Sequence, residues 1–255
     1  MLVDSHCHLD AGEFDPDRAA VVARARAAGV ARQVVPAVEA AGWPRLREVC
    51  AGDAGLFPAY GLHPVFLPAH RPGHLVELRA WLERERPVAV GECGLDFHDA
   101  GLDPQAQQAC FDAQLRLARE FELPLVVHAR RAVDAVIAAI RKVGSLRGVV
   151  HSYAGSAEQA RRLHRLGFLV GLGGPVTYER ANRLRRLAAT LPIDQLLLET
   201  DAPDQPDSAI RGQRNEPARL PVVLAVVAGL RGEDPTALAA ATTANAERLF
   251  DLPPR

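Results

Sequence analysis

Short β-rich runs alternate with longer segments of helical period along the whole chain, and this alternation restricts the fold more than any other feature. Alternating strands and helices imply a parallel sheet. Eight such runs within 255 residues favour a closed (β/α)8 TIM-like barrel over an open doubly wound sheet. The eight runs are Leu2–Leu9, Gln33–Val38, Leu56–His63, Val88–Phe97, Leu123–His128, Gly148–Tyr153, Phe168–Gly173 and Leu196–Thr200.

The segments between and after these runs carry ordinary helix signals. Pro104 stands where proline is tolerated, in the first turn of one segment, and Ser156 precedes another segment as an expected N-cap. No glycine-rich phosphate-binding fingerprint follows the first run, and no Pro- or Ser-rich linker divides the chain. We therefore expect a single domain over residues 1–255. The expected helices include Asp15–Ala28, Pro104–Phe121, Ala157–Leu166, Glu216–Leu230 and Pro235–Phe250.

The composition excludes several classes of protein. The net charge is -1, so there is no global basic field, and any polyanionic substrate must be held by local arginines. The four cysteines form no CxxC pair, which is typical of free thiols in a reducing compartment, and Cys7 and Cys93 are expected to pack in the core. No signal-peptide pattern and no membrane-spanning apolar run is found, so the expected location is the cytoplasm, with no obligate protein partner evident.

His6 and His8 stand one residue apart at the end of the first apolar run. In a strand, residues i and i+2 point to the same face, so both imidazoles could reach one cation. The alternative is an ordinary pair of histidines in a turn. His63, Glu92 and His128 end three further runs.

His151 and Asp201 complete this set at the ends of the sixth and eighth runs. Catalytic residues of a barrel of this kind lie at the carboxyl ends of its strands, so we expect all seven side chains to converge on one mouth. The remaining histidines lie in expected loops or helices and are predicted to be structural. They are His70, His74, His98 and His164.

Imidazole and carboxylate ligands together indicate a divalent metal such as zinc, manganese or magnesium. Four histidines and two carboxylates exceed the needs of one tetrahedral site and suit two ions roughly 3.5–4 Å apart. A carboxylated lysine cannot easily bridge them, because Lys142 is the only lysine and lies in a helical segment, so Glu92 is the available bridge. Asp201 can ligate one ion and accept a proton from a water molecule that is bound to the metal. Glu199 lies deeper and is expected to orient a ligand histidine.

The motifs resemble those of the TatD family of metal-dependent hydrolases and deoxyribonucleases, from residue 2 to about residue 250. The resemblance implies a TIM-like barrel with His6 and His8 on one ion, His128 and His151 on the other, Glu92 between them and Asp201 at the first. It also implies phosphodiester hydrolysis, often of DNA from a 3′ end. The motifs are Asp4-Ser-His-Cys-His-Leu-Asp, Gly61-Leu-His-Pro, Gly91-Glu-Cys-Gly-Leu-Asp, His128-Ala-Arg, His151-Ser-Tyr-Ala-Gly-Ser, Glu199-Thr-Asp-Ala-Pro, Arg214-Asn-Glu-Pro and Asn245-Ala-Glu-Arg-Leu-Phe.

Substrate phosphate is expected to meet side chains near the same mouth. Arg130 and Arg214 are candidates because a guanidinium can hold two phosphate oxygens, and for Arg211 and Arg214 the interpretation stays open between phosphate and a salt bridge. His63 is predicted to bind substrate from outside the ligand set. Asn215 is expected to cap the helix that follows it.

Three functions remain open at this point. The first is a two-metal phosphodiesterase acting on DNA as a 3′-5′ exonuclease-like deoxyribonuclease. The second is a two-metal hydrolase of a small amide, ester or phosphoester, since two-metal sites serve all of these reactions. The third is a non-catalytic metal-binding protein. Glu92 and Asp201 argue against the third, because a scaffold needs neither a bridge nor a base.

Overall fold

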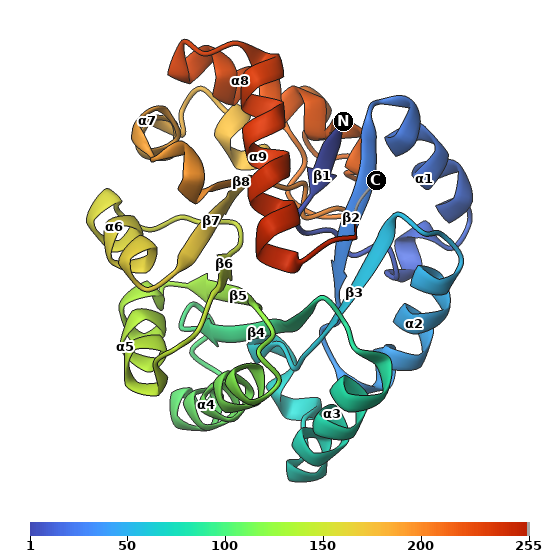
Figure 1. The fold of residues 1–255 in the computed structure, drawn as a ribbon, viewed down its shortest axis with the longest axis vertical. Coiled ribbons are helices and arrows are strands. Elements are labelled where there is room, and N and C mark those ends of the chain that lie inside the picture. Colours follow the sequence, from blue (N-terminus) through green and yellow to red (C-terminus); the bar gives the residue numbers. More distant parts are fainter. Residues whose placement is uncertain (254–255) are drawn as a thin grey trace.

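In the computed structural model, which describes residues 1–253, eight parallel strands form one sheet in sequential order from β1 to β8 (Figure 1). The Ser5 N–H donates to Leu198 O (3.1 Å) and the Asp201 N–H to His6 O (2.9 Å), so the first and last strands meet in a nearly closed barrel. The predicted (β/α)8 TIM-like fold is confirmed. The strands are β1 (Leu2–Asp4), β2 (Val30–Pro36), β3 (Leu56–Tyr60), β4 (Ala89–Asp96), β5 (Leu125–Arg130), β6 (Gly148–Val150), β7 (Phe168–Leu172) and β8 (Leu196–Leu198).

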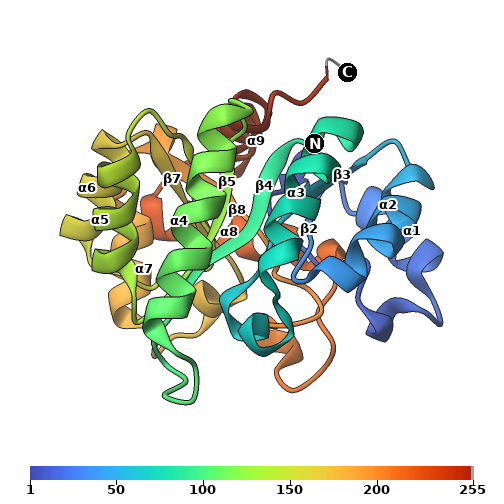
Figure 2. The same ribbon diagram turned by 90° about the horizontal axis from the view of Figure 1, so that it is seen from below.

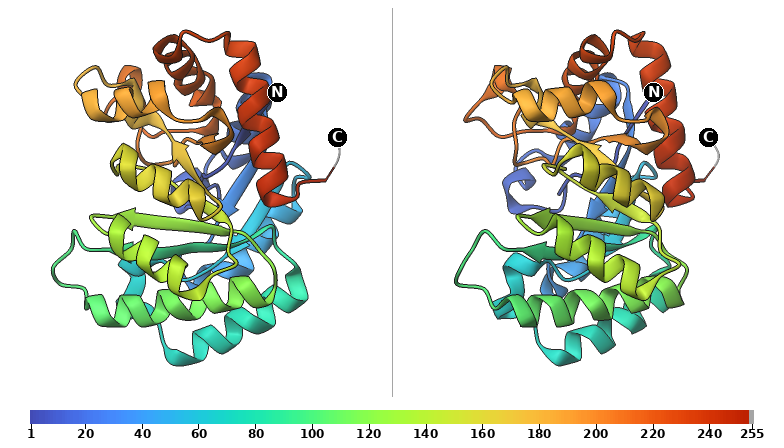
Figure 3. Two further views of the ribbon diagram at one scale, coloured as in Figure 1. Left: turned by 60° about the vertical axis from the view of Figure 1, so that its left-hand side comes forward. Right: turned by 90° about the vertical axis from the view of Figure 1, so that its left-hand side faces the viewer.

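Helices cover the outside of the strands, as the face-on and side views show (Figures 1, 2 and 3). The expected proline and N-cap signals operate at two of them: Pro104 opens α4, and the Ser156 hydroxyl accepts a hydrogen bond from the Gln159 N–H (3.1 Å). The described residues contain α1 (Arg18–Ala27), α2 (Trp43–Ala51), α3 (Pro72–Glu85), α4 (Pro104–Glu120), α5 (Val133–Val143), α6 (Ala157–Arg165), α7 (Asn182–Thr190), α8 (Leu220–Arg231) and α9 (Pro235–Phe250).

The last helix, α9, closes the end of the barrel where the strands begin. Leu249 and Phe250 are buried in one cluster with side chains from inside the barrel, including Val126. The Asn245 side chain donates to Leu196 O (3.0 Å) at the start of β8. In Figure 1 this helix crosses in front of the strands. The opposite end, where the strands terminate, is therefore the one available for a site.

Several predicted elements end elsewhere than expected. The first run was expected to be a strand to Leu9, but β1 ends at Asp4, so His6 and His8 lie beyond the strand. The ladder is interrupted there, because the Ser5 N–H donates to Leu198 O of β8 while the Cys7 N–H, two residues later, donates to Val34 O of β2. The shared strand face proposed for the two histidines is therefore wrong.

The helix expected from Glu216 begins as α8 only at Leu220, because Pro217–Arg219 form a 3-10 turn. Asn215 does not cap it. Its side-chain amide donates to Thr200 O and Asp204 O, both at 2.8 Å, and so ties two turns of one loop together.

The cysteine expectations hold, since all four cysteines are free and Cys7 and Cys93 lie in the hydrophobic core. Within the described part of the chain, none of the helices combines the length and the apolar character that a membrane span requires.

Candidate metal centre

An open cavity of about 1360 Å³ lies at the carboxyl ends of the strands. Six of the seven predicted residues line it, and the seventh, His6, is fully buried just beneath it. The expected convergence at one mouth is therefore observed. The six lining residues are His8, His63, Glu92, His128, His151 and Asp201.

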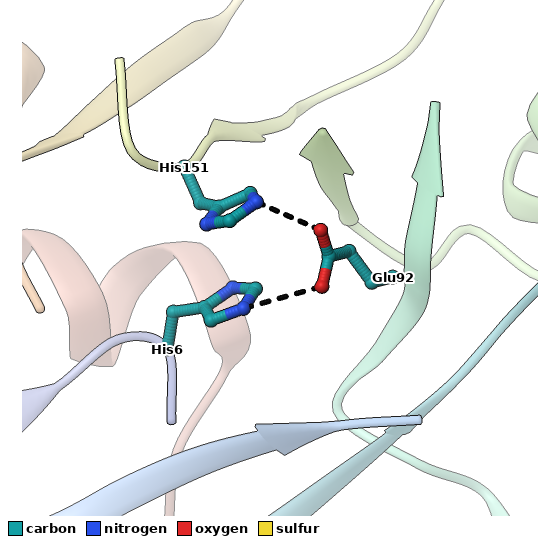
Figure 4. Close-up of side chains that lie close together, drawn as sticks. All are labelled: His6, Glu92 and His151. Carbon is teal, nitrogen blue, oxygen red and sulfur yellow. Dashed lines mark ion pairs between the residues drawn. The ribbon is translucent and has the colours of Figure 1, made fainter. Parts of the chain in front are cut away.

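Glu92, on β4, is the centre of this cluster, and its two carboxylate oxygens face different groups of histidines. Oε1 lies 2.7 Å from His151 Nε2, 3.0 Å from His63 Nε2 and 3.3 Å from His128 Nδ1. Figure 4 shows the carboxylate reaching His151 with one oxygen and His6 with the other. One acid thus faces imidazoles on both sides of the mouth.

The second group gathers around Glu92 Oε2 and Asp201. His6 Nε2 and His8 Nε2 lie 3.3 and 3.5 Å from Oε2 and at the same two distances from Asp201 Oδ1. Their Nε2 atoms are 3.1 Å apart. The ligand atoms of His6, His8 and Asp201 lie within 4.8 Å of one another, which is close enough to hold one ion.

Hydrogen bonds on the far side of two rings determine which nitrogen is free to bind a cation. His8 Nδ1 lies 3.1 Å from Pro36 O, which can only accept, so Nδ1 carries the proton and Nε2 keeps its lone pair. His128 Nε2 lies 2.9 Å from Asp96 Oδ2, which leaves Nδ1 as the donor atom toward Glu92. Such partners are typical of metal-ligating histidines. The donor set therefore fits divalent cations.

His63 is arranged differently from the other histidines. Its Nδ1 accepts a hydrogen bond from the Val65 N–H (3.1 Å), so its proton lies on Nε2 and points to Glu92 Oε1 at 3.0 Å. A ring in this tautomer has no lone pair to offer a cation. His63, Glu92 and His128 place their ligand atoms within 4.8 Å of one another, but with its proton on Nε2 the His63 ring contacts Glu92, and its place outside the ligand set stays a prediction.

Glu199 is fully buried behind the cluster, as its depth in the sequence motif suggested. Its Oε1 lies 3.7 Å from His151 Nδ1, which is longer than a hydrogen bond, and the same oxygen accepts from the Ser152 N–H. Burial, the largest effect, raises the pKa of Glu199 to about 8. The Glu199 carboxyl thus lies near His151 without a hydrogen bond to it, and its role in orienting that ring stays a prediction.

The charges within the cluster are strongly coupled. Burial would raise the pKa of Glu92, but the positive charge of His151 and the neighbouring imidazoles outweigh it and hold that pKa well below its usual range. Burial would lower the pKa of His151, but Glu92 raises it to about 10. By the same balance, the hydrogen bond from His8 holds the pKa of Asp201 at about 2, against burial, and the pKa of His8 rises to about 9. The carboxylates and the imidazoles of the cluster thus shift one another's pKa values in opposite directions.

Glycine is required where β4 passes β5. Gly94 has φ +137°, and a Cβ there would lie 2.1 Å from His128 O. The close approach brings Glu92 and His128 to the same side of the mouth. Glycine allows this approach because it has no Cβ and adopts positive φ readily.

Of the three arginines considered for phosphate binding, only Arg130 lies at the cavity. Arg130 is exposed and lines the cavity, and its guanidinium makes no hydrogen bond or ion pair with any described residue. Arg214 instead pairs with Asp17 through two hydrogen bonds of 2.8 Å and lies over the Phe14 ring. Neither Arg214 nor the exposed Arg211 lines the cavity.

Several supporting residues were missed at the level of sequence. Asp96 orients His128, the Gln205 side chain donates to Asp201 Oδ2, and Asp4 accepts hydrogen bonds from His6 N–H (3.2 Å) and Thr200 N–H (3.0 Å). Asp96 gave the clearest signal, because it is the last residue of the motif that begins at Gly91.

Comparisons with known proteins agree with this geometry. The uncharacterized metal-dependent hydrolase YjjV of Escherichia coli K12 is 41% identical over 257 residues, which cover 99% of this chain and 98% of the relative. The 3′-5′ ssDNA/RNA exonuclease TatD of Cronobacter sakazakii is 38% identical, over 98% of this chain and 97% of its own length.

Solved structures give the same result for the fold. The crystal structure of YjjV, a TatD homologue from Escherichia coli K12, matches with a TM-score of 0.96 at 40% identity, over 99% of this chain and 98% of that one. A TatD family hydrolase from Entamoeba histolytica shares the fold, with a TM-score of 0.86 at 18% identity over 97% of each chain. The sequence model of the family described as TatD related DNase matches residues 3–251. The chain therefore belongs to the TatD-related DNase family and is a metal-dependent hydrolase.

Proposed function

We propose that this protein hydrolyses phosphodiester bonds of DNA with two divalent cations, as a 3′-5′ exonuclease-like deoxyribonuclease. The observation that carries the proposal is the position of Glu92, whose two oxygens face separate groups of histidine ligands. One ion would be held by His6, His8 and Asp201 and the other by His128 and His151. Glu92 would lie between the two ions.

Divalent cations supply Lewis-acid activation of water and of a phosphoryl oxygen in such sites. Asp201 would accept the proton of the attacking water, and the hydrogen bond from Gln205 to Asp201 Oδ2 fixes the orientation of that carboxylate. His63 would hold Glu92 in place through Nε2–H, which replaces the substrate contact expected from the sequence. Arg130, whose guanidinium makes no hydrogen bond or ion pair with the described residues, would bind phosphate.

The size of the cavity favours a polymeric substrate over a small one. Pockets for small ligands usually have volumes of roughly 300–1000 Å³, whereas this cavity measures about 1360 Å³ and is open. A relative named for single-stranded DNA and RNA exonuclease activity supports nucleic acid as the substrate class. We expect zinc, manganese or magnesium to serve, because nitrogen and oxygen ligands suit all three.

The test is a substrate panel on purified, metal-analysed protein. It contains a single-stranded oligonucleotide, the same sequence as a duplex, a nitrophenyl phosphodiester, and small esters and amides, each with Mn²⁺, Zn²⁺, Mg²⁺ or a chelator. We expect metal-dependent release of mononucleotides from a 3′ end. Turnover of small esters or amides without any phosphodiesterase activity would overturn the proposal, as would no turnover at all.

Two arginine variants provide a matched comparison within the panel. Arg130→Ala should raise KM for the oligonucleotide, while Arg214→Ala should leave KM unchanged, because Arg214 is occupied by Asp17. Equal effects of the two variants on KM would refute the assignment of phosphate binding to Arg130.

A further inference from the structure

Two phenylalanine side chains of this chain are exposed to solvent, although exposure of an apolar ring does not stabilise the folded protein. Phe66 is 38% and Phe97 37% exposed, whereas Phe14, Phe111 and Phe168 are completely buried. Phenylalanine is normally buried because this removes a large apolar area from water. Both exposed rings line the cavity above the metal centre. The exposure is therefore concentrated at the place where substrate would bind.

Both rings are positioned by the residues that build the centre. Phe66 lies in the 3-10 turn Pro64–Ala69 after β3, and its ring is 6.0 Å from the ring of His63 at 75°. Phe97 directly follows Asp96 at the end of β4, and its N–H donates to Arg130 O (2.9 Å). The two aromatic side chains thus line the same cavity as Glu92, from the segments that follow β3 and β4, and Arg130 lines it too.

We propose that Phe66 and Phe97 form a stacking platform for the unpaired bases of a single-stranded nucleic acid next to the phosphate being cleaved. The proposal rests on the proposed function and adds the residues that select its substrate. Bases stack on aromatic faces whatever their sequence, because every base has a π-face. Bases within a duplex are already stacked and cover those faces. The platform therefore selects single strands and does not read sequence.

The first experiment compares Phe66→Leu, Phe97→Leu and the double variant with the wild-type protein. Leucine keeps an apolar side chain but removes the aromatic face. Substrates are a single-stranded oligonucleotide and the same oligonucleotide with abasic residues at its 3′ end. Loss of stacking should raise KM for the normal oligonucleotide by about 5- to 100-fold with little change in kcat. On the abasic oligonucleotide, wild type and variants should share one high KM.

Two further variants serve as controls. Phe121→Leu makes the same change at a half-buried phenylalanine that packs against the core and lies outside the cavity lining, and it should leave KM unchanged. Phe97→Tyr keeps the aromatic face and should keep the wild-type KM. Unchanged KM in the double variant, or an equal rise on normal and abasic oligonucleotides, would overturn the platform.

Binding measurements separate this inference from the proposed function. Fluorescence anisotropy with a labelled single-stranded oligonucleotide should show that the double variant binds more weakly than wild type and that Phe121→Leu does not. If wild type cleaves no phosphodiester but binds the oligonucleotide through these rings, the proposed function fails and the platform stands. If cleavage occurs and binding is independent of both rings, the platform fails and the proposed function stands.

Discussion

Asp96→Asn should test the metal centre more sharply than the removal of a ligand, because the change moves one proton and little else. Asp96 Oδ1 accepts from the His98 N–H (2.8 Å), while Oδ2 faces His128 Nε2 at 2.9 Å. Asparagine must keep its oxygen toward His98, so its NH₂ group turns to His128 Nε2. That nitrogen then has to accept, and the ring proton moves to Nδ1, which faces Glu92. The lone pair needed for a cation is lost.

The size of the effect follows from the role of Asp96 as the hydrogen-bond partner of a ligand. Loss of such a partner typically weakens metal affinity by ~10–100-fold. A cation at 100 times the wild-type Kd stabilises the folded protein by about 2.7 kcal/mol. At the same cation concentration, a site with ~10-fold weaker affinity would stabilise it by about 1.4 kcal/mol, and a site with ~100-fold weaker affinity by about 0.4 kcal/mol. The backbone of Asp96 stays anchored, because its N–H and O both bond the Gln107 side chain at 2.8 Å. The fold should therefore survive the change.

Calorimetric titration of Mn²⁺ into chelator-treated protein, with thermal unfolding in parallel, measures both quantities. Asp99→Asn is the matched control, because Asp99 lies three residues further along and its Oδ1 caps only the Gly101 N–H (2.8 Å). The control should bind two equivalents of metal like wild type. Wild-type affinity at both sites in Asp96→Asn would show that His128 does not bind a cation through Nδ1.

Three further outcomes are expected at the same centre. Asp201→Asn should lower kcat by ~10²–10⁴-fold while much of the metal stays bound, since the amide keeps an oxygen but accepts no proton. Steady-state kinetics together with metal analysis measure both effects, and normal turnover would contradict the prediction. Glu92→Gln should weaken both ions together and bind fewer than two equivalents by metal analysis, whereas loss of one ion alone would argue against bridging. Metal affinity should rise with pH below about 9, because His8 and His151, with pKa values of about 9 and 10, must release protons before they bind a cation. Calorimetry in two buffers of different ionisation enthalpy should detect this proton release. Its absence would refute the assignment of both histidines as ligands.

The order of strands could be predicted because it depends on a pattern repeated along the whole chain. Each of the eight predicted runs overlaps one strand, and the strands neighbour one another in sequence order. The ends of the strands could not be predicted, because they depend on which neighbour accepts each backbone hydrogen bond. Beyond Asp4 the sequence is Ser5-His6-Cys7-His8, and the regular strand ends where the Ser5 and Cys7 N–H groups, two residues apart, donate to β8 and to β2 respectively. The local sequence therefore does not indicate at which residue the strand ends.

The residues of the centre were predictable and their surroundings were not. His6, Glu92 and His151 could be placed at one mouth because the carboxyl ends of parallel strands meet there. The acceptor for His8 Nδ1 is the carbonyl of Pro36, a backbone atom that no side-chain motif reveals. Arg214 was a candidate for binding phosphate with a salt bridge as the alternative, and the salt bridge is what the structure shows, with Asp17, which is far away in sequence.

The high pKa of His151 and its proposed role as a neutral ligand follow from one arrangement. His63, His128 and His151 each place a nitrogen within 3.3 Å of the buried Glu92 Oε1, and in such a setting charges must be balanced. The negative charge of Glu92 raises the pKa of His151 and of His128, and bound cations would balance the same charge in place of those protons. It follows that metal affinity, proton release and the orientation set by Asp96 are properties of one cluster, so a variant that disturbs one should disturb the others.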